Sequence, residues 1–111
     1  MAPLPNADAA VLDLRKLEEY CLNRLHPRGR HKARVFQETL GIGQSHAAWL
    51  RQQILSALAE SEAMELESDS YGRRWRIDIP LTRQGRLAVI RTLWLMRTGE
   101  DVPRFVTRRV P

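Results

Sequence analysis

The sequence predicts an α+β domain in which N-terminal helices pack on one face of a roughly four-stranded antiparallel sheet. Apolar residues recur with the helical period between residues 30 and 61, whereas they alternate with a period of two after residue 64. Short turns separate the later segments, which suits antiparallel neighbours. Residues 1–12 show neither pattern and are expected to be a flexible lead-in, so residues 13–111 are expected to form a single domain.

The helical region is expected to contain two well-defined helices after a short helix or turn over residues 8–21. The first runs over residues 30–40, and Gly41 supplies its stop. The second runs over about residues 46–61 with Ser45 as its N-cap, and His46 is expected to assist capping rather than catalysis. The acidic residues that follow, between 60 and 69, are interpreted as a solvated edge.

The strand region begins with a short strand at Met64 and a turn over residues 68–72. Residues 74–79 alternate between polar and apolar side chains, which predicts a half-buried strand that Pro80 ends. After a turn at Gly85, residues 86–97 are apolar at both parities, which favours a central strand covered on both faces. A last strand follows residues 99–103, with Phe105 and Thr107 on the side that faces the helices.

Composition narrows the function classes. The chain of 111 residues carries a net charge of +5, and 16 of its 18 basic residues are Arg, the side chain that pairs bidentately with phosphate. No apolar run is long enough to span a membrane. The single cysteine, Cys21, allows no intrachain disulfide, so a cytoplasmic location is expected. We find no metal-ligand spacing and no nucleotide-binding glycine motif, so neither a metal nor a cofactor is expected.

The most unusual stretch is the basic segment over residues 22–36. Residues 24–34 contain five fixed positive charges and no acid, and two histidines stand among them. Like charges at this density repel one another and suit an anionic ligand. Histidines that titrate near neutral pH add groups suited to acid–base work on a phosphate.

This segment leads to the first functional hypothesis, a metal-independent endoribonuclease of toxin type. Such an enzyme needs a base for the 2′-hydroxyl, an acid for the leaving oxygen and cations for the developing negative charge. The candidate catalytic residues are His26, His31, Lys32 and Thr107. The candidate substrate-binding residues are Arg28, Arg30, Arg34, Arg91 and Arg104. The hypothesis requires Lys32 and Thr107 to lie close together.

The alternative is a non-catalytic, Arg-rich binding module, such as a phage- or plasmid-borne regulator or inhibitor. Its partners would be RNA or another polyanion, or an acidic protein such as an antitoxin or immunity protein. The two hypotheses differ in geometry. A ribonuclease needs a histidine, Lys32 and a strand-borne arginine in one cleft, whereas a binding module spreads its arginines over an open face.

The basic segment also resembles a leader of the form LNP-x-HP-x-GG-x-KA-x-x-F. The matching positions are Leu22, Asn23, His26, Pro27, Gly29, Lys32, Ala33 and Phe36. Later positions resemble a closing arm of the form R-T-x-W…R-x-G-E-D-x-P-R-x-V-T, from Arg91 to Thr107. Arg24 and Arg30 depart from the leader, where they replace a proline and a glycine.

On these motifs the chain resembles an uncharacterised bacterial family, a domain of unknown function. The resemblance implies a toxin-type context, because related modules look like those at the C-termini of polymorphic toxins. It also implies a fold similar to that of the barnase, EndoU, colicin and RelE class of ribonuclease toxins.

Overall fold

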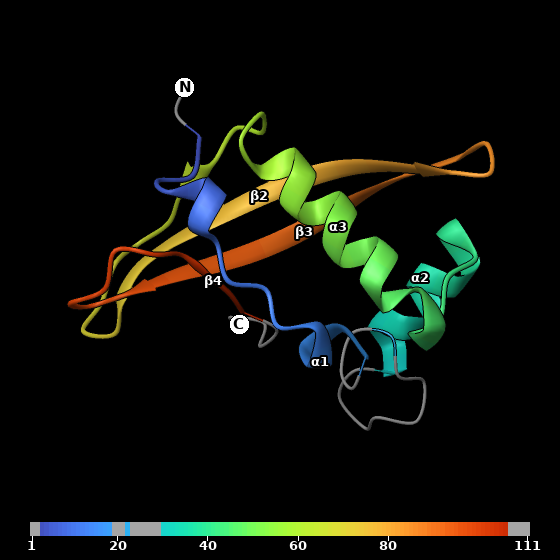
Figure 1. Cartoon of the computed structure of the whole chain (residues 1–111), viewed down its shortest axis with the longest axis horizontal. Helices are drawn as coiled ribbons and strands as arrows, with labels where there is room; N and C mark the ends of the chain where they lie inside the picture. The colour runs from blue at the N-terminus through green and yellow to red at the C-terminus, as the bar shows by residue number, and fades with distance from the viewer. Residues whose placement is uncertain (1–2, 19–21, 23–29, 107–111) are drawn as a thin grey trace.

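The structure, a computed structural model, describes residues 3–18, 22 and 30–106, although not the side chains of residues 30–33 and 35. Its helical elements are η1 (Ala7–Ala9), α1 (Leu14–Lys16), α2 (Arg30–Leu40), η3 (Gln44–His46) and α3 (Ala47–Leu58). Its strands are β1 (Met64–Glu65), β2 (Gly72–Arg83), β3 (Arg86–Arg97) and β4 (Arg104–Val106). Helices precede strands along the chain (Figure 1).

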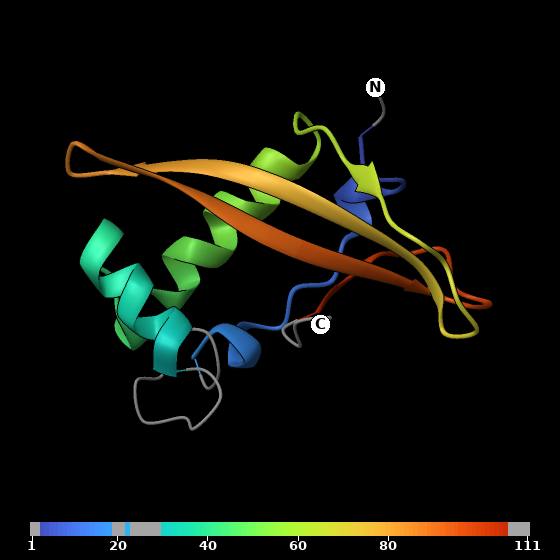
Figure 2. The ribbon, with the colours of Figure 1, turned by 180° about the vertical axis from the view of Figure 1, so that it is seen from behind.

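The strands form one antiparallel sheet in the order β1-β2-β3-β4, so each strand pairs with its neighbour in sequence. The helices lie on one side of this sheet, and β2 and β3 pass in front of α3 when the molecule is seen from behind (Figure 2). The predicted α+β fold with helices on one face of a four-stranded antiparallel sheet is therefore confirmed.

The long β2–β3 hairpin dominates the sheet. Its two-residue turn has positive φ at both Gln84 (51°) and Gly85 (77°), which is the type I′ geometry that matches the twist of paired strands. β2 continues three residues beyond Pro80, so the prediction that Pro80 ends this strand is wrong. Pro80 pairs in register with Val89, and its missing N–H faces the edge of β2 that β1 leaves uncovered.

The two faces of the hairpin differ in burial. The inner face carries Trp75, Ile77, Ile79 and Leu81 from β2, all of them buried. On β3 the prediction of a strand covered on both faces is wrong, because the side chains of Leu87 and Val89 are 69% and 64% exposed. The helices cover only one face, so Leu87 and Val89 on the other face remain exposed.

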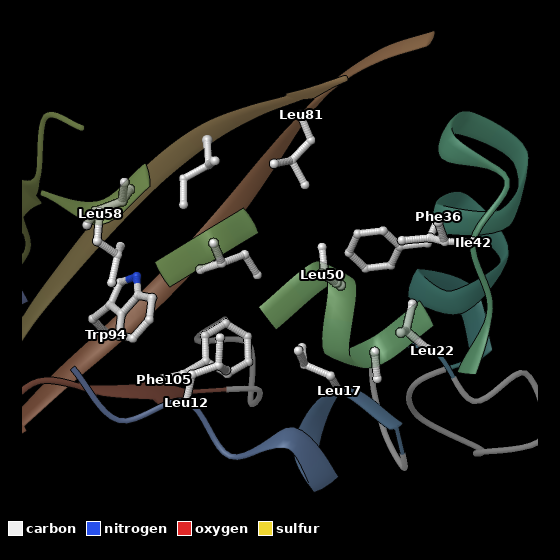
Figure 3. Packing of buried hydrophobic residues seen from close by; sticks show 14 of the residues in the cluster. Leu12, Leu17, Leu22, Phe36, Ile42, Leu50, Leu58, Leu81, Trp94 and Phe105 are labelled. Atoms are coloured by element: carbon white, nitrogen blue, oxygen red, sulfur yellow. The ribbon is translucent and has the colours of Figure 1, made fainter. Parts of the chain in front are cut away.

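The core lies between α3 and the inner face of the sheet (Figure 3). α3 contributes one apolar face, Ala47, Leu50, Ile54 and Leu58. Trp94 and Phe105 meet edge to face with ring centroids 5.5 Å apart, which fixes β4 against β3. Leu4 and Leu12, from the stretch expected to be a lead-in, are also buried in this core.

The loop between α2 and α3 reverses the chain. Gly41 follows α2 with φ of +68°, as the predicted stop requires, and its N–H donates to the Gln37 carbonyl. The helical run begins with η3, whose cap residue is Gly43 rather than the predicted Ser45. His46 assists this cap as predicted, since its Nδ1 accepts a hydrogen bond from the Gly43 N–H at 3.0 Å.

Candidate polyanion-binding site

Several predicted site residues cannot be placed. His26, Arg28 and Thr107 lie outside the described residues. Arg30, His31 and Lys32 lie in the first turn of α2, but their side chains also lie outside the description. The proximity of Lys32 and Thr107 therefore stays a prediction.

Arg34 is exposed on α2, where its Nε donates to the Glu38 carboxylate at 3.1 Å, one turn later. An exposed pair of this kind contributes little to stability, typically about 0.3–0.5 kcal/mol. Arg34 is thus available to a ligand, but it carries its own counter-charge.

Arg91 and Arg104 share the outer face of the sheet, the face without helices. The register places Arg91 opposite Asp78, and Arg91 Nε lies 3.2 Å from that carboxylate. Arg104 donates to both carboxylate oxygens of Glu100, from Nε at 3.2 Å and from Nη2 at 2.9 Å. The hydrogen bond from Arg104 lowers the pKa of Glu100 below its ordinary value. The structure therefore brings these two predicted residues onto one face, but each is already paired with an acid.

The other arginines in the first part of β2 and at the end of β3 also form ion pairs with acids. Their ion pairs are Arg73–Glu65, Arg74–Asp69, Arg76–Asp78 and Arg97–Glu100. Two strand arginines differ, since neither Arg83 nor Arg86 forms an ion pair with any described residue. They flank the hairpin turn, so the uncompensated positive charge of the sheet gathers at the tip of the hairpin.

We call Arg83, Arg86, His46 and Trp49 the tip cluster. Arg83 Nη1 donates to the carbonyls of Leu40 and Gly41, at 3.1 and 3.3 Å. These carbonyls belong to the C-terminal end of α2, whose partial negative charge attracts a cation. Arg86 also reaches this end, because the Nη1 atoms of both arginines would lie within 3.6 Å of a Cβ placed on Gly41.

His46 adds an excess of hydrogen-bond donors to the tip cluster. Its Nδ1 faces the Gly43 N–H, and its Nε2 lies 3.3 Å from Arg83 Nη2. A neutral imidazole has one acceptor nitrogen and one N–H, whereas Arg and the backbone N–H can only donate. When Nδ1 accepts from Gly43, the Nε2 proton and the Arg83 protons face one another. An oxygen that accepts from both groups would resolve this conflict.

Trp49 completes the cluster on the α3 side. The Arg83 guanidinium lies over its ring, 5.8 Å from the centroid, and the indole is half-buried. A cation held over an aromatic ring is positioned with little freedom, which favours a preformed site. The cluster therefore offers two guanidinium groups, an imidazole and an aromatic surface at one end of the molecule.

The tip cluster was not among the residues predicted from the sequence. The signal was Arg-Gln-Gly-Arg over residues 83–86, because a two-residue turn places its flanking residues directly opposite each other. The turn at Gly85 was predicted. Because the strand was expected to end at Pro80, Arg83 was not expected to lie in the hairpin opposite Arg86. Nothing in the sequence indicated that His46 and Trp49 lie beside Arg83.

Comparison with protein families assigns the chain to one family. It matches the family described as Domain of unknown function (DUF6883) over residues 3–111. The chain belongs to this family. Comparisons with curated proteins and with solved structures gave no match. The described residues of this chain contain no cluster of three side chains that could hold a metal ion. They also contain no helix that is long and apolar enough to cross a membrane.

Proposed function

We propose that this DUF6883 domain is a binding module for polyanions, with single-stranded RNA as the favoured ligand, and that the tip cluster is its phosphate-binding site. The observation that carries the proposal is that Arg83 and Arg86 converge without a carboxylate partner among the described residues. The other described strand arginines have one.

Phosphate chemistry suits this arrangement. A phosphodiester presents two anionic oxygens, and guanidinium groups pair with such oxygens in a fork geometry that lysine does not offer. The donor excess at His46 supplies a further N–H for the same ligand. The Arg83 guanidinium lies over the Trp49 ring, which holds this guanidinium in place for a phosphate group.

Charge along the chain supports the same ligand. The net charge is +5, and three basic residues, Arg30, Lys32 and Arg34, fall in the first half of α2. The C-terminal end of that helix meets the tip cluster through Arg83. A ligand bound at the tip could therefore extend along a basic helix.

The test is fluorescence anisotropy with a labelled single-stranded RNA. Arg86→Gln should weaken binding and reduce the slope of log K against log salt by about 0.7, the value for one lost phosphate contact. Arg97→Gln is the matched control, because it removes the same charge from the other end of β3, where Glu100 already pairs with it. Equal losses in both variants would show a non-specific charge effect, and a flat salt response would remove the polyanion proposal.

The endoribonuclease hypothesis keeps one specific observation in its favour. On the outer face, the Asp78 carboxylate lies between Arg76 Nε at 3.7 Å and Arg91 Nε at 3.2 Å. A carboxylate base between two cations is an arrangement that phosphodiester cleavage without a metal can use. Asp78 was not among the predicted site residues, and ordinary cross-strand ion pairing also explains it.

Incubation of the pure protein with RNA and a chelator tests the enzyme hypothesis directly. Cleavage that Asp78→Asn or His26→Ala lowers by about a hundredfold or more would support catalysis, since general acid–base groups contribute about 10²–10⁴-fold. The corresponding control is Asp101→Asn, an exposed acid that lies on the loop before β4. RNA that binds but is not cleaved would leave the binding module as the function.

A further inference from the structure

The tip cluster brings three separate donor side chains to one place. Arg83 Nη2 lies 3.3 Å from His46 Nε2. The Nη1 atoms of Arg83 and Arg86 each lie within 3.6 Å of the point where a Cβ on Gly41 would stand, so no more than twice that distance separates them. A hydrogen bond spans about 2.7–3.2 Å between nitrogen and oxygen. One phosphate group can therefore accept from all three side chains.

Each of these side chains keeps a donor for a ligand. Arg83 uses Nη1 for two carbonyls at the end of α2, which leaves Nη2 and Nε. A neutral His46 whose Nδ1 accepts from the Gly43 N–H carries its proton on Nε2. Arg86 forms no ion pair with a described acid, and its guanidinium offers five N–H groups. A ligand with three acceptor oxygens can engage each side chain through an oxygen of its own.

The number of acceptor oxygens distinguishes a phosphate at the end of a strand from one inside it. An internal phosphodiester has two non-bridging oxygens and one negative charge. A terminal phosphomonoester has three such oxygens and a charge of about −1.5 to −2 at pH 7. Two guanidinium groups and one further donor match the monoester in both charge and number of oxygens.

The place of the cluster in the molecule also suits the end of a strand. The turn of the β2–β3 hairpin lies at one end of the longest axis of the molecule (Figure 1). From the cluster, α2 leads back to Arg34, which stands six residues before Leu40 and about 9 Å from it along the helix axis. A strand that ends at the tip can follow this helix, whereas a strand that passes through the tip extends past the turn into solvent.

We propose that the tip cluster binds the terminal phosphate of an RNA strand. Arg83 and Arg86 neutralise the two negative charges, and the His46 Nε2–H donates to the third oxygen. The inference rests on the polyanion-binding function proposed above, and it adds a preference for strand ends.

Competition against a labelled single-stranded RNA tests this preference. The competitors are one short RNA with a 5′-phosphate, with a 3′-phosphate, or with hydroxyl groups at both ends. At least one phosphorylated strand should compete at least tenfold better than the hydroxyl strand, and the better one assigns the end. Equal competition by all three strands would overturn the inference.

Two further competitors separate a terminal phosphate from added charge in general. The methyl ester of the preferred terminal phosphate has one charge and one free oxygen fewer, so it should lose most of the advantage. A hydroxyl-ended strand that is one nucleotide longer carries one more internal phosphate and should gain little. If the longer strand gains as much as the phosphorylated one, total charge explains the preference and the inference is wrong.

Variants of the protein locate the preference in the cluster. Arg86→Gln should lower the ratio of affinities for the phosphorylated and hydroxyl strands, whereas Arg97→Gln should keep this ratio. His46→Asn offers an amide oxygen near the position of Nδ1 for the Gly43 N–H but has no donor at the position of Nε2, so it should lower the ratio as well. His46→Gln, whose longer amide reaches that position, should retain more of it. Thermal unfolding checks that each variant folds, and a ratio unchanged in both Arg86→Gln and His46→Asn would overturn the inference.

The outcomes also separate this inference from the proposed function. RNA binding that depends on Arg86 and on salt, but not on the chemistry of the strand end, would overturn only the preference for ends. Binding of adenosine 5′-monophosphate without any binding of RNA would indicate a site for a small phosphomonoester and would overturn both proposals.

Discussion

At the scale of single residues, the only buried polar side chain that the structure describes belongs to Thr92. Its Oγ1 donates to the Ile77 carbonyl at 2.7 Å and accepts from Trp94 Nε1 at 2.8 Å. The hydroxyl therefore satisfies the indole N–H, which lies in the core with no access to water.

Thr92→Val should destabilise the fold by about 1–3 kcal/mol, because it keeps the shape of the side chain but leaves the Trp94 N–H without an acceptor. Urea unfolding measures the change. In a Trp94→Phe background, which has no such N–H, the same substitution should cost clearly less. An equal cost in both backgrounds would show that the hydroxyl does not serve the indole.

The Arg104–Glu100 pair makes stability depend on pH. The hydrogen bond from Arg104 lowers the pKa of Glu100 in the folded protein. A lowered folded pKa stabilises the protein above the ordinary carboxyl range, and this contribution disappears as pH falls through the folded value. Glu100→Gln should therefore lower the melting temperature near neutral pH, and the difference should vanish in strong acid. The control is Glu60→Gln, since Glu60 pairs with no described base; a constant difference at all pH values would contradict the prediction.

At the scale of elements, the β2–β3 hairpin depends on close backbone approach at its base. Gly72 opens β2 with φ of +144°, and it pairs with Arg97. A Cβ at this position would overlap the Met96 carbonyl oxygen. The positive φ and the overlap both require glycine here.

Gly72→Ala should destabilise the fold by about 1–3 kcal/mol, the range for forced overpacking. Chemical unfolding with circular dichroism measures it. Gly43→Ala is the matched control, because Gly43 has an extended φ of −132° and a Cβ there would meet nothing within 4 Å. The control should change stability by less than about 0.5 kcal/mol. Similar losses at both positions would show that the backbone approach at Gly72 is not the cause.

At the scale of the whole molecule, arginines with an acid partner and arginines without one lie at different places. The described acid–arginine pairs involve α2, the base and middle of the hairpin and the β3–β4 loop, whereas Arg83 and Arg86 at the tip form no ion pair with a described acid. Separation of this kind raises the potential at one end and steers an anion toward it.

A polyanion should therefore stabilise the folded chain. Inorganic polyphosphate at about a hundred times its Kd should raise the free energy of unfolding by about 2.7 kcal/mol, since it binds the folded state. Thermal unfolding measures the effect, and added salt should reverse it. Arg86→Gln should reduce the stabilisation, whereas Arg97→Gln should reduce it less. Stabilisation that persists in high salt would argue against an electrostatic site.

The sequence by itself determined the class of fold, because periodicity reports which residues face a core. The helical spacing of Leu50, Ile54 and Leu58 and the alternation at Trp75, Ile77 and Ile79 identified elements that the structure confirms. The stop at Gly41 and the capping role of His46 were also read correctly, since both depend on a few neighbouring residues.

Only the tertiary structure decided which faces and which charges are free. The apolar run in β3 does not say whether one layer or two cover it. Pro80 does not say that its ring nitrogen, which lacks a hydrogen, faces the part of the β2 edge that β1 leaves unpaired. Likewise, Arg91 and Arg104 were predicted from the sequence to bind a ligand. Their ion pairs with Asp78 and Glu100 depend on strand register and loop geometry, which the sequence does not show. Arg83 meets His46 and the end of α2 across 37 and 42 residues. Such contacts depend on how the elements pack, and local periodicity carries no information about that.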